Sequence, residues 1–152
     1  MEPSAARYDE RLTAPPSWWG IAALIAVAGG LITLPMGPLP MLGGVIGAGA
    51  LAAAGVSSYG SARIRVVADS LVAGEARIPV SALGEAEVLD AEEARAWRLH
   101  KADPRAFMLL RSYVPTALRV EITDPDDPTP YVYVSTRDPK ALAAALNAVR
   151  AA

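Results

Sequence analysis

The chain has 152 residues, with 14 Lys and Arg residues against 16 Asp and Glu residues, and it contains no cysteine. This near-neutral charge balance argues against nucleic-acid binding, which needs a basic surface. The lack of cysteine excludes disulfides, thiolate zinc sites and cysteine nucleophiles, and it is compatible with a reducing compartment.

A long uncharged segment lies near the N-terminus. Residues 12–62 contain no Asp, Glu, Lys, Arg or His, and burying a charge in hydrocarbon costs several kcal/mol. Two apolar stretches, residues 18–34 and 41–57, reach the short end of the roughly 17–25 residues that a spanning helix needs. The intervening PMGPLP cannot continue a helix because of its prolines. We therefore predict a transmembrane helical hairpin at residues 18–60, preceded by a cytoplasmic segment at residues 1–17.

Two other interpretations of the apolar segment have less support. A hairpin buried inside a soluble protein would need a larger remaining chain to enclose two apolar helices. A cleaved signal peptide would need a basic n-region of the usual form, and here a second apolar run follows the first at once. The pattern therefore favours a membrane hairpin.

Positive charges flank the hairpin on both sides. Arg7 and Arg11 precede the first stretch, Arg63 and Arg65 follow the second, and the turn between the stretches is uncharged. Because cytoplasmic loops carry the excess of Lys and Arg, we expect a protein of the bacterial plasma membrane with both termini in the cytoplasm. Three aromatic residues are expected at one membrane interface: Trp18, Trp19 and Tyr59.

Small residues recur at every fourth position of both apolar stretches, and such residues let helix backbones approach closely in lipid. The repeats are Ala22, Ala26 and Gly30 in the first stretch and Gly44, Ala48 and Ala52 in the second, with a GxxxG pair at Gly43 and Gly47. We expect these residues to hold the hairpin together, with a homodimer interface as the alternative. The few polar side chains of the stretches argue against transport by this chain alone.

The sequence from residue 61 onward has the pattern of a β-rich cytoplasmic domain, which we place at residues 61–152. Apolar and polar residues alternate as in antiparallel strands with one buried and one solvent-exposed face. Helices are expected after the capping residues Asp90 and Asp138. The expected strands are residues 63–67, 71–79 with a bend at Gly74, 85–89, 106–113, 117–123 and 131–136. This layout predicts an α+β fold, in detail a small pleckstrin-homology-like split barrel with a C-terminal helix.

The most suggestive polar group consists of Arg111, Tyr113, Arg119 and Arg137, next to Ser135 and Thr136. If the strands pair as consecutive hairpins, these side chains converge near one end of the sheet, where arginines bind a carboxylate or phosphate bidentately. The alternative is a structural network with nearby acidic residues, namely Glu121, Asp124 and Asp138. From residue 63 onward, 12 basic residues face 13 acidic ones, without the sequence cluster of roughly 4–8 Lys and Arg that indicates capture of anionic lipid headgroups.

The remaining polar and aromatic residues fit ordinary structural roles. His100 is the only histidine, and without a second histidine or a cysteine we expect neither a metal site nor a general base. The DPDDP sequence at residues 124–128 lacks the alternating oxygen ligands of a calcium loop and predicts a turn. Trp97 is expected to pack under the sheet or to dip into the lipid interface. Tyr131 and Tyr133 are expected on the solvent-exposed face of their strand.

Two stretches carry a resemblance to a known family. YDERLTAPPSWWG at residues 8–20 and the segment from DPRAFMLLRSY to KALAAAL at residues 103–146 are similar to an actinobacterial family of two-span membrane proteins, domain of unknown function 3093. The resemblance covers nearly the whole chain. It implies a membrane protein with a small cytoplasmic domain, and it brings no catalytic residue or cofactor with it.

We therefore expect a membrane-anchored, non-enzymatic interaction module, with the lipid bilayer and a membrane or cytoplasmic protein as its partners and with no cofactor. The reason is that a short anchor adjoins an antiparallel domain in which no catalytic constellation is visible. A lipid- or small-anion-binding protein is the first alternative. A membrane-associated enzyme acting on a lipid headgroup is the second.

Overall fold

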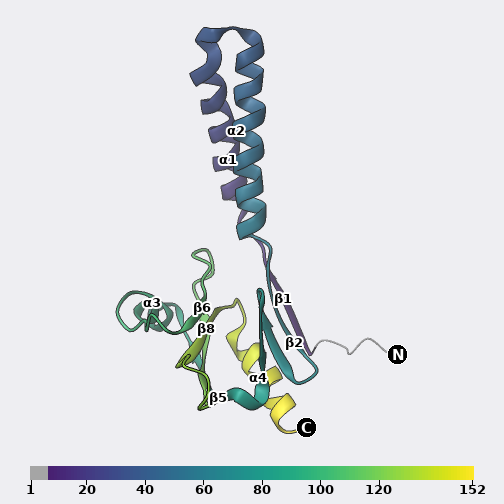
Figure 1. Ribbon diagram of the computed structural model, residues 1–152, viewed down its shortest axis with the longest axis vertical. Helices are drawn as coiled ribbons and strands as arrows, with labels where there is room; N and C mark the ends of the chain where they lie inside the picture. The colour runs from purple at the N-terminus through teal and green to yellow at the C-terminus, as the bar shows by residue number, and fades with distance from the viewer. Residues whose placement is uncertain (1–6) are drawn as a thin grey trace, which may run out of the picture. The chain divides into compact units, whose positions relative to one another are not determined.

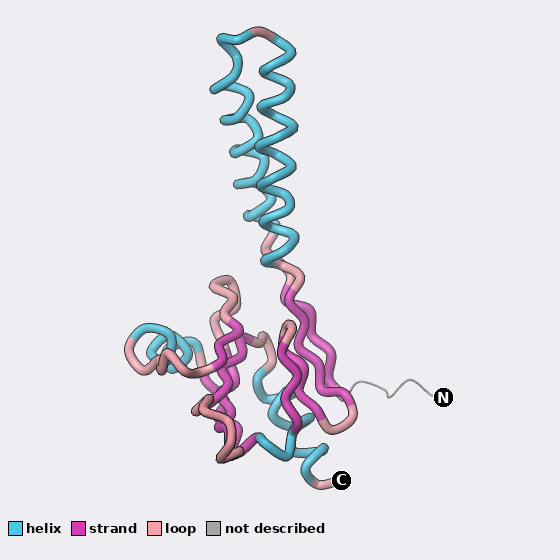
Figure 2. Tube along the Cα trace, viewed as in Figure 1, coloured by secondary structure: helices cyan, strands magenta, loops and turns pink. Residues whose placement is uncertain are grey.

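The computed structural model of the chain describes residues 7–152 (Figure 1). It divides into two compact units, Thr13–Ala62 and a second unit that joins residues 7–12 to Arg63–Ala152. Helices dominate the first unit and strands the second (Figure 2). Residues 8–12, which we expected in a separate N-terminal segment, therefore belong to the β-rich domain, because they form a strand of its sheet. Residues 1–6 of that segment lie outside the described residues.

The first unit is a helical hairpin. Helix α1 (Pro16–Thr33) and helix α2 (Pro38–Tyr59) are joined by a single 3-10 turn, η1 (Leu34–Met36). Both helices begin with a proline in their first turn, where its missing N–H leaves no bond unmade. Gly37 between η1 and α2 has a φ of +113°, a conformation open mainly to glycine. By length and composition both helices can cross a membrane.

The helices of the hairpin cross at two glycines. A Cβ atom added at Gly29 would lie 2.5 Å from the carbonyl oxygen of Gly44, and one added at Gly44 would collide with the Gly29 oxygen and the Thr33 hydroxyl. The Thr33 Oγ1 donates to the Gly29 oxygen at 3.0 Å, which satisfies its hydroxyl within α1. Gly43 and Gly47 have no neighbour within 4 Å of such a Cβ. The GxxxG pair of the sequence therefore faces away from α1, and a different pair of glycines makes the close contact.

The second unit contains two four-stranded sheets. The first has the order β1-β2-β3-β4, with antiparallel pairing of β2 with β3 and of β3 with β4. Its strands are β1 (Tyr8–Leu12), β2 (Ala62–Val67), β3 (Ser70–Ala73) and β4 (Ala76–Pro79). The bend expected at Gly74 is the β3–β4 turn, where this glycine has a φ of +61°.

The second sheet has the order β5-β7-β8-β6. Its strands are β5 (Leu83–Leu89), β6 (Phe107–Leu109), β7 (Ala117–Ile122) and β8 (Tyr131–Ser135). The short helix η2 (Val80–Ala82) connects the two sheets. Strand β6 is parallel to β8 rather than paired with β7. The expectation of consecutive antiparallel hairpins is therefore wrong for β6, and the observed class is α+β with one antiparallel and one mixed sheet.

Two helices complete the domain. Helix α3 (Ala91–Leu99) is capped by Asp90, whose carboxylate accepts the Glu93 N–H at 2.8 Å. Helix α4 (Pro139–Arg150) is capped by Asp138, which accepts the Ala141 N–H at 3.0 Å. Both caps are those that the sequence predicts. Helix α4 packs against β5 and β7, so the C-terminal helix covers the second sheet.

Strand β8 lies at the centre of the core and is buried along its whole length. Val132 and Val134 are directly across from Val120 and Leu118 of β7, and all four are buried. Tyr131 and Tyr133 are on the other face, in a cluster with Leu89, Ala94 and the partly buried Trp97. The expectation that the tyrosines face solvent is therefore wrong, because α3 covers that face of the sheet.

The glycine crossing gives the first testable prediction. Gly44→Ala places a methyl group against the Gly29 carbonyl, and such overpacking costs about 1–3 kcal/mol. Gly43→Ala is the matched control, since its methyl group meets no neighbour and alanine favours the helix. Thermal unfolding in detergent, followed by circular dichroism, is expected to show a lower Tm for Gly44→Ala alone. Equal Tm values for the two variants would contradict the crossing.

Candidate functional site

Arg119 is a largely enclosed member of the arginine and tyrosine group. It lies on β7 directly across from Tyr133, and its side chain is 17% exposed. The guanidinium group is 3.0 Å from the Glu87 carboxylate and 3.6 Å from that of Glu121. It also stacks over the ring of Trp97, 4.4 Å from its centroid. Two carboxylates thus already hold Arg119, which opposes capture of an external anion there.

Trp97 packs against the sheet, as the first of its two expected roles requires. Its ring meets Tyr131 edge to face with 5.3 Å between centroids, and the Lys101 ammonium lies 5.4 Å from the ring centre. Leu99, two residues further along α3, is 61% exposed. We call Trp97, Leu99, Lys101 and Arg119 the α3 patch: Lys101 and Arg119 adjoin the Trp97 ring, and Leu99 is exposed on another side of the same helix end.

A polar depression of about 300 Å³ adjoins Arg119, lined by Glu85, Ala86, Glu87, Arg119 and Glu121. Its charge is set by three carboxylates against one guanidinium group. The depression therefore favours no anionic ligand. Among residues 7–152 no group of three or more His, Cys, Asp or Glu side chains is arranged to hold a metal ion.

The other three members of the group lie near the ends of β8 and β1. The Arg111 backbone N–H donates to the Ser135 hydroxyl at 3.1 Å, and the Tyr113 hydroxyl donates to the Leu12 carbonyl at 2.9 Å. A guanidinium N–H of Arg137 reaches the Arg11 carbonyl at 3.5 Å. In these contacts the three residues bind protein backbone and side-chain groups. Arg119 on β7 takes part in none of the three. These three residues thus meet protein groups near Leu12 and Ser135, whereas Arg119 meets Glu87, Glu121 and Trp97.

A hydrogen-bond network around Glu10 joins β1 to the end of β8. One carboxylate oxygen of Glu10 accepts from the Tyr8 hydroxyl at 2.8 Å and from the Thr136 hydroxyl at 2.5 Å. The other accepts the Arg137 backbone N–H at 2.9 Å. Burial is the main cause that raises the pKa of Tyr8, and the neighbouring Glu10 carboxylate adds to it. No local pattern signals this network, because its halves are more than a hundred residues apart in the chain.

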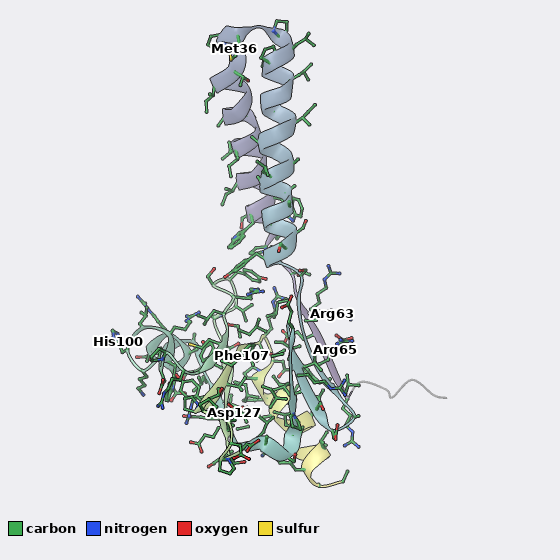
Figure 3. All side chains as sticks on the ribbon, in the orientation of Figure 1. Met36, Arg63, Arg65, His100, Phe107 and Asp127 are labelled. Atoms are coloured by element: carbon green, nitrogen blue, oxygen red, sulfur yellow. The ribbon has the colours of Figure 1, made fainter. Side chains whose placement is uncertain are left out.

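Arginines gather on the outer face of the β1-β2-β3-β4 sheet. Ile64 and Val66 of β2 are fully buried, so the alternating Arg63 and Arg65 point outward, where Figure 3 labels them. Arg65 is directly across from Val72, and Val72 from Arg77. We call Arg11, Arg63, Arg65 and Arg77 the arginine face. Sequence reasoning missed it, because three strands contribute to it.

The aromatic residues at the open end of the hairpin form a pair. The rings of Trp18 and Tyr59 stack in parallel, with 5.3 Å between centroids and 4° between planes. Trp19 is 47% exposed. Trp18 and Trp19 are near the start of α1, and Tyr59 is at the end of α2. All three are therefore at the same end of the hairpin, as the sequence predicts. A position at a membrane interface stays a prediction.

His100 and the proline-rich turn take ordinary roles. His100 is exposed at the end of α3. In the turn, Asp124 accepts the Asp126 N–H at 3.0 Å and Asp127 accepts the Thr129 N–H at 2.8 Å. The second of these bonds lowers the pKa of Asp127. Both bonds are Asx turns, and they lie within the proline-rich turn that the sequence predicts between β7 and β8.

Two apolar helices of spanning length, inserted into the chain of a small α+β domain, define the class of protein. The family DUF3093, described as a protein of unknown function, matches residues 7–146. The chain therefore belongs to this family. No curated protein and no solved structure matches the chain.

The Glu10 network gives the second prediction. Because burial raises the pKa of Tyr8 above its ordinary 10.0, the unfolded chain releases the phenolic proton first as the pH rises. The stabilisation that comes from the raised pKa of Tyr8 is fully present in the free energy of unfolding below pH 10 and declines above it. Tyr8→Phe is expected to cost about 1 kcal/mol at pH 7, by losing hydrogen bonds, and to make the alkaline decline shallower. Denaturant unfolding between pH 7 and pH 11 measures both the loss of stability and its pH dependence. Parallel curves of unfolding free energy against pH for wild type and Tyr8→Phe would contradict this role of Tyr8.

Proposed function

We propose that the protein is a membrane-anchored, non-enzymatic interaction module whose α3 patch binds a protein partner at the cytoplasmic face of a bacterial plasma membrane. The exposed leucine at the end of α3 carries this proposal. The anchor is the α1–α2 hairpin, whose helices have the length and apolar composition to span. Each end of the hairpin continues directly into a strand of the domain.

The composition of the α3 patch supports a protein partner. Tryptophan, tyrosine and arginine dominate the binding energy of protein interfaces. Among the described residues outside the hairpin, the large apolar side chains most open to solvent are Leu99, at 61%, and Val88, at 37%. The ring of Trp97 and the carboxylate of Glu87 hold Arg119 in place, so little side-chain entropy is lost when a partner covers it. A partner with an apolar pocket fits this surface.

The proposal also includes a fold type and an origin. Two sheets and a C-terminal helix favour a pleckstrin-homology-like domain, although the parallel β6–β8 pair departs from that layout. The family resemblance favours an actinobacterial two-span protein. An enzyme has less support, because His100 is exposed and the lowered pKa values of Asp103 and Asp127 follow from hydrogen bonds at the surface. Anion binding at Arg119 has less support because two carboxylates hold it.

The third prediction tests the α3 patch. Leu99→Glu places a charge at its exposed leucine, and we expect at least about a tenfold loss of a stoichiometric partner retained by the full chain in mild detergent. Val88→Glu is the matched control. It adds the same charge at an exposed apolar residue of β5, on the face opposite to Glu87 and Arg119. Quantitative mass spectrometry compares the variants with wild type. Equal retention by wild type and Leu99→Glu would refute the assignment.

The fourth prediction tests the orientation of the hairpin. Since the chain has no cysteine, single cysteines report on their own positions. A membrane-impermeant maleimide is expected to label Met36→Cys in the exposed η1 turn on intact spheroplasts, because both termini are proposed to be cytoplasmic. Asn147→Cys on the exposed side of α4 is expected to react only after lysis. The reverse pattern would overturn the proposed orientation.

A further inference from the structure

Positive charge predominates on the arginine face, with four arginines. Asp9 is the acidic side chain that shares it, and its carboxylate pairs with Arg63 at 2.8 Å. Asp69 and Glu75 lie in the β2–β3 and β3–β4 turns, at opposite ends of the sheet. Within residues 7–152, no ion pair engages Arg11, Arg65 or Arg77. Three guanidinium groups on this face are therefore available to an anionic partner.

The sheet holds these charges in fixed positions. Arg65 and Arg77 flank Val72 across three neighbouring strands, and all three share one face. The Nε atom of Arg65 is buried and has no hydrogen-bond partner among the described residues. Arginine suits phosphate in particular, because its planar group donates two parallel hydrogen bonds.

The chain connects this face to both ends of the hairpin. Arg11 precedes the start of α1 by five residues, and Arg63 follows the end of α2 by four. Four extended residues reach at most about 14 Å. Arg63 is therefore tied near the surface of any membrane that the hairpin spans, where anionic headgroups attract basic side chains. An acidic protein has no comparable link to these residues.

We propose that the arginine face binds the phosphate groups of anionic phospholipids in the leaflet next to the open end of the hairpin. This inference rests on the membrane anchoring proposed above, and it is independent of the α3 patch. It gives the protein a second contact with the bilayer besides its helices. The binding energy is electrostatic and is therefore screened by salt.

A cysteine in the middle of the face tests this inference in the full chain. Val72→Cys is placed in nanodiscs of phosphatidylcholine, with or without about one-third phosphatidylglycerol, and its reaction with an uncharged maleimide is timed. Anionic lipid is expected to slow the reaction about tenfold at low salt, and about 1 M salt is expected to restore it. Asn147→Cys on α4 reports general effects of the nanodisc on the domain.

Two charge-matched backgrounds decide the outcome. Adding Arg65→Gln and Arg77→Gln is expected to abolish the slowing. Adding Arg95→Gln and Lys140→Gln removes the same charge from exposed residues outside the face and is expected to preserve it. Equal rates in the two lipids, or equal loss of the slowing in both backgrounds, would overturn the inference. Failure of the chain to co-purify with the nanodisc would refute the anchoring itself, and the inference with it.

Discussion

The pairing of β1 with β2 is the constraint on which the rest of the structure depends. The hairpin leaves the domain after β1 and returns through β2, and these strands are neighbours in one sheet. The Arg7 N–H donates to the Val66 carbonyl at 2.9 Å, and the Asp9–Arg63 ion pair adds a second link. At the hairpin's own end, Gly60 lies so close to Ala14 that a Cβ would be 2.7 Å from the Ala14 nitrogen. The segment that leads into α1 and the segment that follows α2 are thereby held side by side.

The Glu10 network extends this constraint to the C-terminal half of the domain. Strand β1 is short, and a five-residue edge strand pairs with only one neighbour. The bonds from Glu10 to Thr136 and Arg137 connect it to the segment between β8 and α4. A residue close to the first apolar helix is thus part of the same packed unit as the last helix of the chain. The domain therefore needs both flanks of the hairpin for its fold.

The arginines of the domain divide into two kinds according to their surroundings. Arg119 is enclosed by an aromatic ring and two carboxylates, so its charge is satisfied within the protein. Arg65 and Arg77 lie on an open sheet face without ion pairs among the described residues. The same side chain therefore serves packing in one place and is available for recognition in the other. This difference separates the proposed protein surface from the proposed lipid surface.

The sequence by itself determined the local features of the protein. The uncharged run at residues 12–62, the proline-rich turn and the caps at Asp90 and Asp138 each act through neighbouring residues, so a linear pattern suffices to predict them. Only the tertiary structure decided that β1 joins the sheet, that β6 lies parallel to β8 and that α3 buries Tyr133. It also gathered the arginine face from three separate strands. These features depend on contacts between residues far apart in the chain, and alternation along one strand does not reveal what covers either of its faces.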